Sequence, residues 1–155
     1  MQLSGYPPGV SLPNERVCAV DLGKVRVGIA VSDELLVLAH PRRALDGSNR
    51  NALLAALSAL AEEEGITRFV VGYPVEMAGG HGAAAERAHK FALALKSATG
   101  REVELVDERL TTVEASRRLS EAGKQKKAQK KAIDSAAAAV LLQAWLDAKS
   151  ARGGR

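Results

Sequence analysis

The sequence predicts an α/β fold in which a mixed five-stranded sheet is flanked by helices. Three apolar runs separated by short turns come first, and this pattern is typical of an antiparallel meander. Helical and strand-like periods then alternate, which indicates parallel strands joined by helices. With 155 residues, of which 46% are hydrophobic, the chain has the size and apolar content of one domain. We assign this domain to residues 16–150.

The first two strands are predicted at 17–20 and 27–31, where apolar and β-branched residues dominate. Asp21 falls where the first strand ends, Gly23 gives the turn conformational freedom, and two cations, Lys24 and Arg26, stand beside the acid. A purely structural hairpin can contain the same residues. The turn therefore becomes a candidate site only if other acids meet Asp21.

Changes of period predict the remaining elements. A third strand at 35–39 follows a turn at 32–34 and is closed by His40 and Pro41. A helix then runs from the N-cap Ser48 to Glu64, where Gly65 stops it, and a strand at 66–71 follows that should lie parallel to the first. The next helix has its apolar stripe on 84–95 and stops at Gly100, and a strand at 102–105 runs into Asp107. The capping box of Thr111 and Glu114 opens another helix, and the longest helix is predicted at about 127–148.

Both ends of the chain are predicted to lie outside the domain. Residues 1–15 contain three prolines and two glycines and should form a flexible arm, and residues 151–155 should be a frayed tail. The N-terminus lacks the pattern of a signal peptide, and no apolar run reaches the ~18 residues of a membrane span. We therefore expect a cytoplasmic protein. The single cysteine, Cys18, should be a small core residue of the first strand.

The net charge of +4 is concentrated in one segment. Between residues 117 and 131 seven cations face one acid, Glu121, while the rest of the chain is slightly acidic. We expect this segment to contact nucleic-acid phosphates, although a solvated helix face would show the same pattern. The cations assigned to these contacts are Lys124, Lys126, Lys127, Lys130 and Lys131. Aromatic residues are too scarce for a base-stacking platform.

Carboxylates from distant parts of the chain should meet at one edge of the sheet, because parallel strands end at the same edge. Asp21 and the pair Asp107 and Glu108 end strands there, and Asp134 precedes an apolar helix body where an unpaired acid would be costly. Asp21, Asp134 and either Glu108 or Asp107 would suit Mg²⁺ or Mn²⁺, which prefer oxygen ligands. Such ions can activate a water and stabilise the leaving oxygen of a phosphodiester.

Other residues around this predicted metal site would support it. The cations expected to hold the flanking backbone are Lys24, Arg26 and Arg109, and the loop residues expected near the site are Gly23, Gly72, Pro74 and Glu76. No His or Cys pair has zinc-site spacing, and no P-loop is present in the sequence.

Four stretches together resemble the YqgF family, also called RuvX, over residues 16–147. They are DLGKVRVGIAVSD at 21–33, VVGYPVEMAGG at 70–80, DERLTTVEA at 107–115 and AIDSAAAAVLLQ at 132–143. The family is regarded as pre-16S rRNA nucleases and as Holliday-junction-resolvase-like enzymes. The resemblance implies an RNase H-like fold and metal-dependent cleavage by acids at Asp21, Glu108 or Asp107, and Asp134. The second motif has Glu76 where the family pattern has Asn, and Glu76 stays an alternative ligand.

The resemblance leaves more than one function open. The main prediction is 5′-end processing of pre-16S rRNA, and the nearest alternative is the resolution of branched DNA, since the same metal site would cut either substrate. The first motif also resembles the phosphate loop of actin-like and sugar-kinase folds, of which this chain would supply one lobe. A non-catalytic RNA-binding factor would need the carboxylates only to satisfy Lys24, Arg26 and Arg109.

The assembly state is also left open by the sequence. The last helix is apolar around most of its circumference, so a stripe that contains Trp145 would be uncovered in a monomer and buried in a homodimer. A monomer follows if the rest of the domain covers that stripe.

Overall fold

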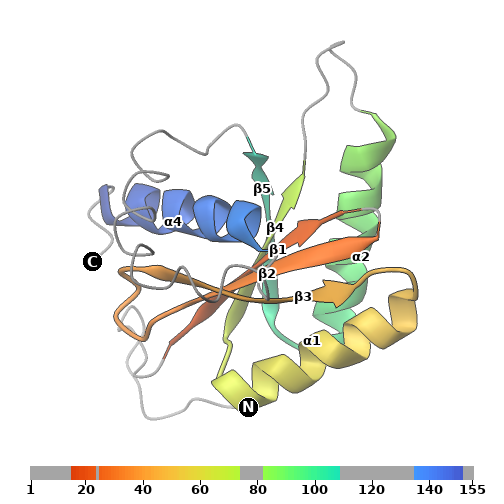
Figure 1. The fold of residues 1–155 in the computed structure, drawn as a ribbon, viewed down its shortest axis with the longest axis horizontal. Helices are drawn as coiled ribbons and strands as arrows, with labels where there is room; N and C mark the ends of the chain where they lie inside the picture. The colour runs from red at the N-terminus through yellow and green to blue at the C-terminus, as the bar shows by residue number, and fades with distance from the viewer. Residues whose placement is uncertain (1–14, 24, 74–81, 109–134, 152–155) are drawn as a thin grey trace.

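A computed structural model describes residues 15–23, 25–73, 82–108 and 135–151. Its sheet has five strands in the order β3-β2-β1-β4-β5 (Figure 1). The strands are β1 Val17–Leu22, β2 Arg26–Ser32, β3 Ala39–Asp46, β4 Arg68–Tyr73 and β5 Glu102–Asp107. β1 pairs antiparallel with β2, and β2 antiparallel with β3, whereas β4 runs parallel to both β1 and β5. The predicted mixed sheet is confirmed.

Helices cover both faces of this sheet. Helices α1 (Arg50–Glu64) and α2 (Ala83–Thr99) contact each other on one face, and α4 (Ala136–Ala151) crosses the other face (Figure 1). Side chains of β1 alternate between two separate cores: Cys18 and Val20 pack toward α1 and α2, and Val17 and Ala19 pack toward α4. Asp21 continues this alternation and therefore lies on the α4 face.

The predicted helix ends are partly confirmed. Gly65 and Gly100 end α1 and α2 with φ of 67° and 72°, a left-handed conformation that favours glycine. The N-cap of α1 is Asn49, whose side chain accepts a hydrogen bond from the Ala52 backbone N–H at 2.9 Å. The predicted cap Ser48 is wrong, because its own N–H is engaged by the Asp46 carboxylate.

The third strand lies later in the chain than predicted. Residues 35–38 belong to the turn before it, where Leu35 and Val37 are 80% and 54% exposed. The Asp33 carboxylate accepts hydrogen bonds from the backbone N–H groups of Val37 and Leu38 at 2.8 and 2.9 Å, and these bonds hold the turn. The apolar composition at 35–39 predicted a strand, but the polar side chain before it fixes a turn instead.

The last helix begins at Ala136, not at about 127, because Ser135 precedes the helix and accepts its first backbone hydrogen bond, from Ala139. Among the described helices the longest is α2, with 17 residues, rather than α4 with 16. Trp145 is only 7% exposed, because it packs on the sheet and Lys149 Nζ lies 5.6 Å from its ring centroid. The expected uncovered stripe at Trp145 is therefore wrong, and with it the basis for the predicted homodimer.

Several other expectations can be placed. Cys18 is fully buried, as predicted, and burial raises the pKa of its thiol. The outer strands of the sheet carry Pro41 in β3 and the exposed Glu102 and Glu104 in β5. None of the described helices is long and apolar enough to cross a membrane. The predicted arm apart from Glu15, the glycine-rich loop over 74–81, the helix after Thr111 and the tail at 152–155 lie outside the described residues.

Candidate active site

Asp21 ends β1 between two glycines of the neighbouring strands. Its Cα partners in the sheet are Gly28 of β2 and Gly72 of β4. Because neither neighbour carries a side chain, no side chain of β2 or β4 projects next to the Asp21 carboxylate on the α4 face. A larger residue at either position would occupy space next to this carboxylate.

Gly72 lies directly against Leu141 of α4. A Cβ atom added to Gly72 would lie 2.5 Å from Cδ2 of Leu141 in α4 and 3.5 Å from Cγ of Glu108. The Glu108 side chain thus extends from the end of β5 over the bare backbone of β4, toward Asp21. The glycine allows two carboxylates on strands separated by β4 to meet.

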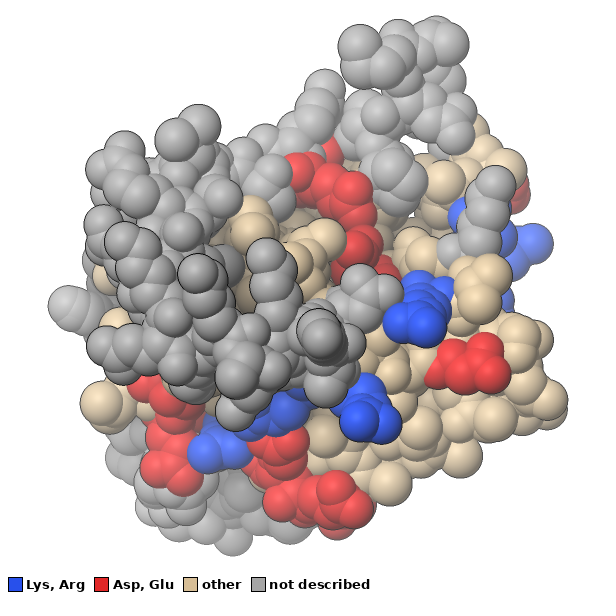
Figure 2. Space-filling view, viewed as in Figure 1, with Lys and Arg blue, Asp and Glu red and all other residues tan. Residues whose placement is uncertain are grey.

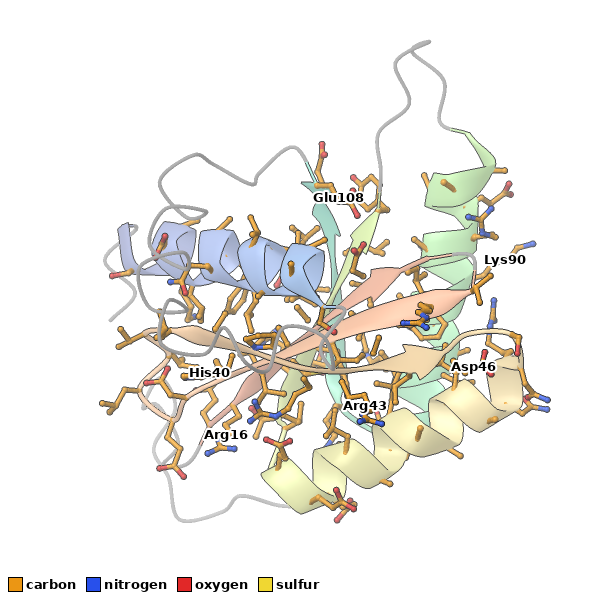
Figure 3. All side chains as sticks on the ribbon, viewed as in Figure 1. Arg16, His40, Arg43, Asp46, Lys90 and Glu108 are labelled. Carbon is orange, nitrogen blue, oxygen red and sulfur yellow. The ribbon has the colours of Figure 1, made fainter. Side chains whose placement is uncertain are left out.

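Asp21 and Glu108 form a hydrogen-bonded carboxyl pair. Partial burial, the hydrogen bond to Asp21 and the negative charges of Asp21 and Asp107 together raise the pKa of Glu108 to about 7. Two carboxyl groups can share a hydrogen bond only if one of them holds a proton, so near neutral pH Glu108 carries that proton for much of the time. Figure 3 places Glu108 at the end of β5, and Figure 2 shows acidic side chains at the surface in that region.

The structure distinguishes between the two acids that the sequence left open. Asp107 pairs in register with Tyr73, and successive residues of a strand point to opposite faces. Glu108 therefore lies on the α4 face with Asp21, whereas Asp107 belongs to the other face and acts on the pair through its charge. Among the described acids, Glu108 is the one that the fold brings to Asp21.

Ser135 fixes the start of α4 beside the same carboxylate. Its side-chain oxygen accepts a hydrogen bond from the Ile29 backbone N–H at 2.9 Å, next to an irregularity in the pairing of β2 with β3. A Cβ added to Gly28 would lie 3.5 Å from Cα of Ser135 and 3.6 Å from Cβ of Asp21. Sequence reasoning missed Ser135, although a serine directly before an apolar helix is a recognisable N-cap signal.

The remaining predicted residues are placed as follows. Arg26 begins β2, is exposed and pairs in register with Asp46 of β3. Gly23 follows β1, and a side chain there would collide with the carbonyl oxygen of Arg26. Asp134, Lys24, Arg109, Pro74, Glu76, Lys124, Lys126, Lys127, Lys130 and Lys131 lie outside the described residues. Within the parts that the structure describes, no three acid, His or Cys side chains are grouped closely enough to hold a metal ion.

The family of the chain follows from comparison with known proteins. Residues 15–148 match the RuvX family, which is described as Holliday junction resolvase. The chain belongs to the RuvX family. The predicted YqgF/RuvX membership is thereby confirmed, and so is the predicted enzyme class of the family, a nuclease that hydrolyses phosphodiesters.

Relatives of this RuvX-family chain are similar over nearly their whole length. A protein of Anaeromyxobacter sp. (strain Fw109-5), named as a proposed pre-16S rRNA nuclease, is 43% identical over 136 residues, which cover 88% of this chain and 99% of the relative. A protein of the same name from Myxococcus xanthus (strain DK1622) is 42% identical over 133 residues, covering 86% and 88% of the two chains.

Solved structures show the fold of the RuvX-family chain. The structure of T. thermophilus RuvC in complex with a Holliday junction substrate superposes with a TM-score of 0.56 and 15% identity, over 90% of this chain and 96% of RuvC. A second Thermus thermophilus RuvC structure gives a TM-score of 0.55 with the same coverage. The predicted RNase H-like fold is confirmed.

Proposed function

We propose that this RuvX-family protein is a cytoplasmic, divalent-metal-dependent nuclease that acts in 5′-end processing of pre-16S rRNA. The observation that carries the proposal is the hydrogen-bonded pair of Asp21 and Glu108, which Gly72 allows to meet on the α4 face of the sheet. The substrate is taken from the names of the relatives that are 42–43% identical.

The carboxyl pair fits a divalent cation. Two carboxylates placed this close repel each other, and the raised pKa of Glu108 measures that repulsion together with partial burial. A Mg²⁺ or Mn²⁺ ion in place of the shared proton would neutralise both groups through oxygen ligands. Asp21 and Glu108 would hold the ion, which when bound supplies an activated water and charge stabilisation at the phosphodiester.

Asp134 is the proposed third ligand. One peptide bond joins it to Ser135, and Ser135 is anchored to the Ile29 N–H beside Asp21. Asp134 directly precedes this anchored serine in the sequence, and for that reason it is the acid proposed to complete the site. Ser135 acts as a positioning residue in this proposal, while Asp107 and Glu76 are not required as ligands.

The phosphate contacts of the proposal come from the predicted cations. Lys24, Arg26 and Arg109 adjoin the proposed ligands in sequence, and the basic segment precedes Asp134. These side chains would position the RNA by its backbone, without reading its sequence.

The test is cleavage of a precursor 16S rRNA by the purified protein with Mg²⁺ or Mn²⁺, and with EDTA as the metal-free control. We expect cleavage that EDTA abolishes, and its loss in Asp21→Asn and Glu108→Gln. Glu104→Gln is a matched control, because Glu104 lies on β5, which ends directly before Glu108, and pairs with Arg68 at 3.9 Å. This control should cut at the wild-type rate, since an exposed ion pair contributes little.

A four-way DNA junction in the same buffer tests the alternative substrate, which rests on the family description. Cleavage of the junction but not of the precursor RNA would replace the rRNA assignment by branched-DNA resolution. Full activity of Asp21→Asn in processing rRNA in cells would overturn the nuclease assignment and favour a non-catalytic RNA-binding factor.

A further inference from the structure

Lys and Arg side chains of the described residues form ion pairs with acids at one end of the sheet, whereas several at the other end do not. At the end where β4 and β5 begin, cations are held by acids in ion pairs of 2.9 to 3.9 Å. These pairs are Arg16–Glu64, Arg42–Glu64, Arg68–Glu104, Lys96–Glu102 and Arg101–Glu62. Their charge is locally balanced, so this end of the protein offers little to an anionic partner.

Three cations at the other end have no ion pair with any described acid. Arg50, Arg87 and Lys90, here called the α1–α2 cationic face, surround Phe91 of α2. The guanidinium carbon of Arg50 lies 5.5 Å from the ring centroid of Phe91, Arg87 lies one helical turn before it, and Lys90 precedes it directly. Figure 3 shows Lys90 pointing away from the sheet, and Figure 2 shows Lys and Arg side chains over α2.

The packing of Arg50 on Phe91 prepares its guanidinium for an anion. A guanidinium stacked on an aromatic ring keeps its N–H groups at the rim, where they remain available to phosphate oxygens. The stack also limits the side-chain freedom that binding would otherwise remove. All three side chains of the face belong to exposed residues.

The cationic face lies at the same edge as the carboxyl pair. Arg50 is the first residue of α1, directly after the turn that ends β3. In that turn the Gly47 N–H donates to the carbonyl oxygen of Val25 at 2.7 Å, and Val25 belongs to the turn that follows Asp21. Two connected turns therefore link the end of β1 to the start of the cationic face.

Two nearby acids lower the net charge of this face but form no ion pair with its three cations. Asp46 accepts a hydrogen bond from the Ser48 N–H, and Glu86 lies four residues before Lys90 without forming an ion pair with it within 4 Å. The N-termini of α1 and α2 lie at this edge, and their helix dipoles add positive potential there.

We infer that the α1–α2 cationic face binds the phosphodiester backbone of the RNA substrate at the edge of the sheet where the carboxyl pair lies, with the pair on the α4 face and the cations on the α1–α2 face. The inference deepens the proposed function and rests on it for the identity of the RNA. It adds a contact surface that is separate from the basic segment at 117–131. Sequence reasoning missed it, because Arg50 is far from Arg87 and Lys90 in the chain and only the fold brings them together.

The test compares two double variants that each remove two positive charges. Arg87→Ala/Lys90→Ala changes the cationic face, and Arg68→Ala/Lys96→Ala removes two cations held in ion pairs of 3.9 and 3.7 Å. Arg50 is kept in both variants because it covers Phe91. Affinity for a fluorescent RNA with the 5′ precursor sequence of 16S rRNA is measured by anisotropy in EDTA, so that no cleavage occurs. Circular dichroism checks that each variant is folded.

The expected result is a change in salt dependence for one variant only. Each lost phosphate contact flattens the slope of log affinity against log salt by about 0.7 to 0.9, so Arg87→Ala/Lys90→Ala should flatten it by about 1.4 to 1.8. Between about 50 and about 200 mM salt the wild type should then lose about tenfold more affinity than this variant. Arg68→Ala/Lys96→Ala should keep the wild-type slope.

Equal slopes for the two variants would overturn the inference. Equal slopes together with normal precursor cleavage by the wild type would leave the proposed function intact. If the variants show the expected slopes but the wild type does not cut the RNA in Mn²⁺, the inference of a binding surface would stand and the proposed nuclease function would be overturned. Absence of RNA binding by the wild type would overturn both proposals.

Discussion

Replacing Gly72 with alanine should lower the stability of the protein by a measurable amount. The added Cβ would lie 2.5 Å from Cδ2 and 3.4 Å from Cδ1 of Leu141. Carbon atoms in contact are ordinarily about 3.5 to 4.0 Å apart, so Leu141 or α4 must move by about 1 Å. Leu141 is only 2% exposed and packs in the core under α4, which limits its freedom to turn away.

Overpacking of this kind costs about 1 to 3 kcal/mol in the free energy of unfolding. For a domain of this size each kcal/mol lowers Tm by about 2 to 4 °C, so we expect Tm to fall by about 2 to 12 °C. Thermal unfolding followed by circular dichroism in EDTA measures this difference without interference from a bound ion.

Gly28→Ala is the matched control for this substitution. Gly28 is the other glycine beside Asp21, but the nearest atom to its added Cβ is Cβ of Ala138 at 3.4 Å, an ordinary contact. Its Tm should stay within about 2 °C of the wild type, because the added methyl group meets its neighbours at ordinary contact distances and no side chain has to move. A Tm for Gly72→Ala that equals that of the wild type, or of Gly28→Ala, would refute the reasoning.

Leu141→Val provides a second check on the cause. It shortens the side chain that the new methyl group meets, so the two substitutions should be less than additive when combined. Strict additivity would show that Gly72→Ala acts through something other than Leu141.

Three further predictions concern side chains around the same face. The pKa of Glu108 is raised in the folded state to about 7 from an ordinary 4.5, so the stabilising contribution of Glu108 is full below pH 4.5 and is lost as the pH rises through 7. The Tm of the metal-free protein should therefore fall over this pH range, and Asp21→Asn should make the fall smaller. Ser135→Ala removes the acceptor of the buried Ile29 N–H and should cost about 1 to 3 kcal/mol in urea unfolding. Gln143→Met removes a fully buried amide that bonds Ala39 N–H and the Val37 carbonyl oxygen in the turn before β3. It should lower the free energy of unfolding by a similar amount and speed up amide hydrogen exchange in that turn.

Each of these predictions can fail on its own. An identical pH dependence of Tm in wild type and Asp21→Asn would show that the two carboxyl groups do not interact. An unchanged unfolding midpoint in Ser135→Ala would mean that α4 is held at its start by other contacts. For Gln143→Met, wild-type exchange rates of the Ala39 amide would contradict the role assigned to the glutamine.

The strands and their order could be predicted because the periodicity of apolar residues follows directly from which faces are buried. The third strand could not, since an apolar turn and a strand have the same composition at 35–39. Hydrogen bonds to the turn, from its own backbone to Asp33 and from the Gln143 side chain, distinguish them. Local polar contacts of this kind compete with strand formation and leave little trace in the apolar pattern.

The sequence could predict at which edge of the sheet the candidate site lies, but not on which face of the sheet each acid lies. Asp21 could be placed because it ends an apolar strand. Asp107 and Glu108 could not be told apart, because a shift of one residue in register moves a side chain to the opposite face of the sheet. The pairing of Tyr73 with Asp107 places Asp107 on the face opposite Asp21, and no single-sequence pattern reports that pairing.

The outer strands of the sheet have a consequence for how the protein behaves at high concentration. An exposed strand edge is a template on which another chain can add by backbone hydrogen bonding. Pro41 removes one N–H donor from β3, and the charges of Glu102 and Glu104 discourage a second copy from approaching β5. Both margins of the sheet therefore oppose edge-to-edge aggregation, so raising the protein concentration should not by itself drive strand-to-strand pairing between copies.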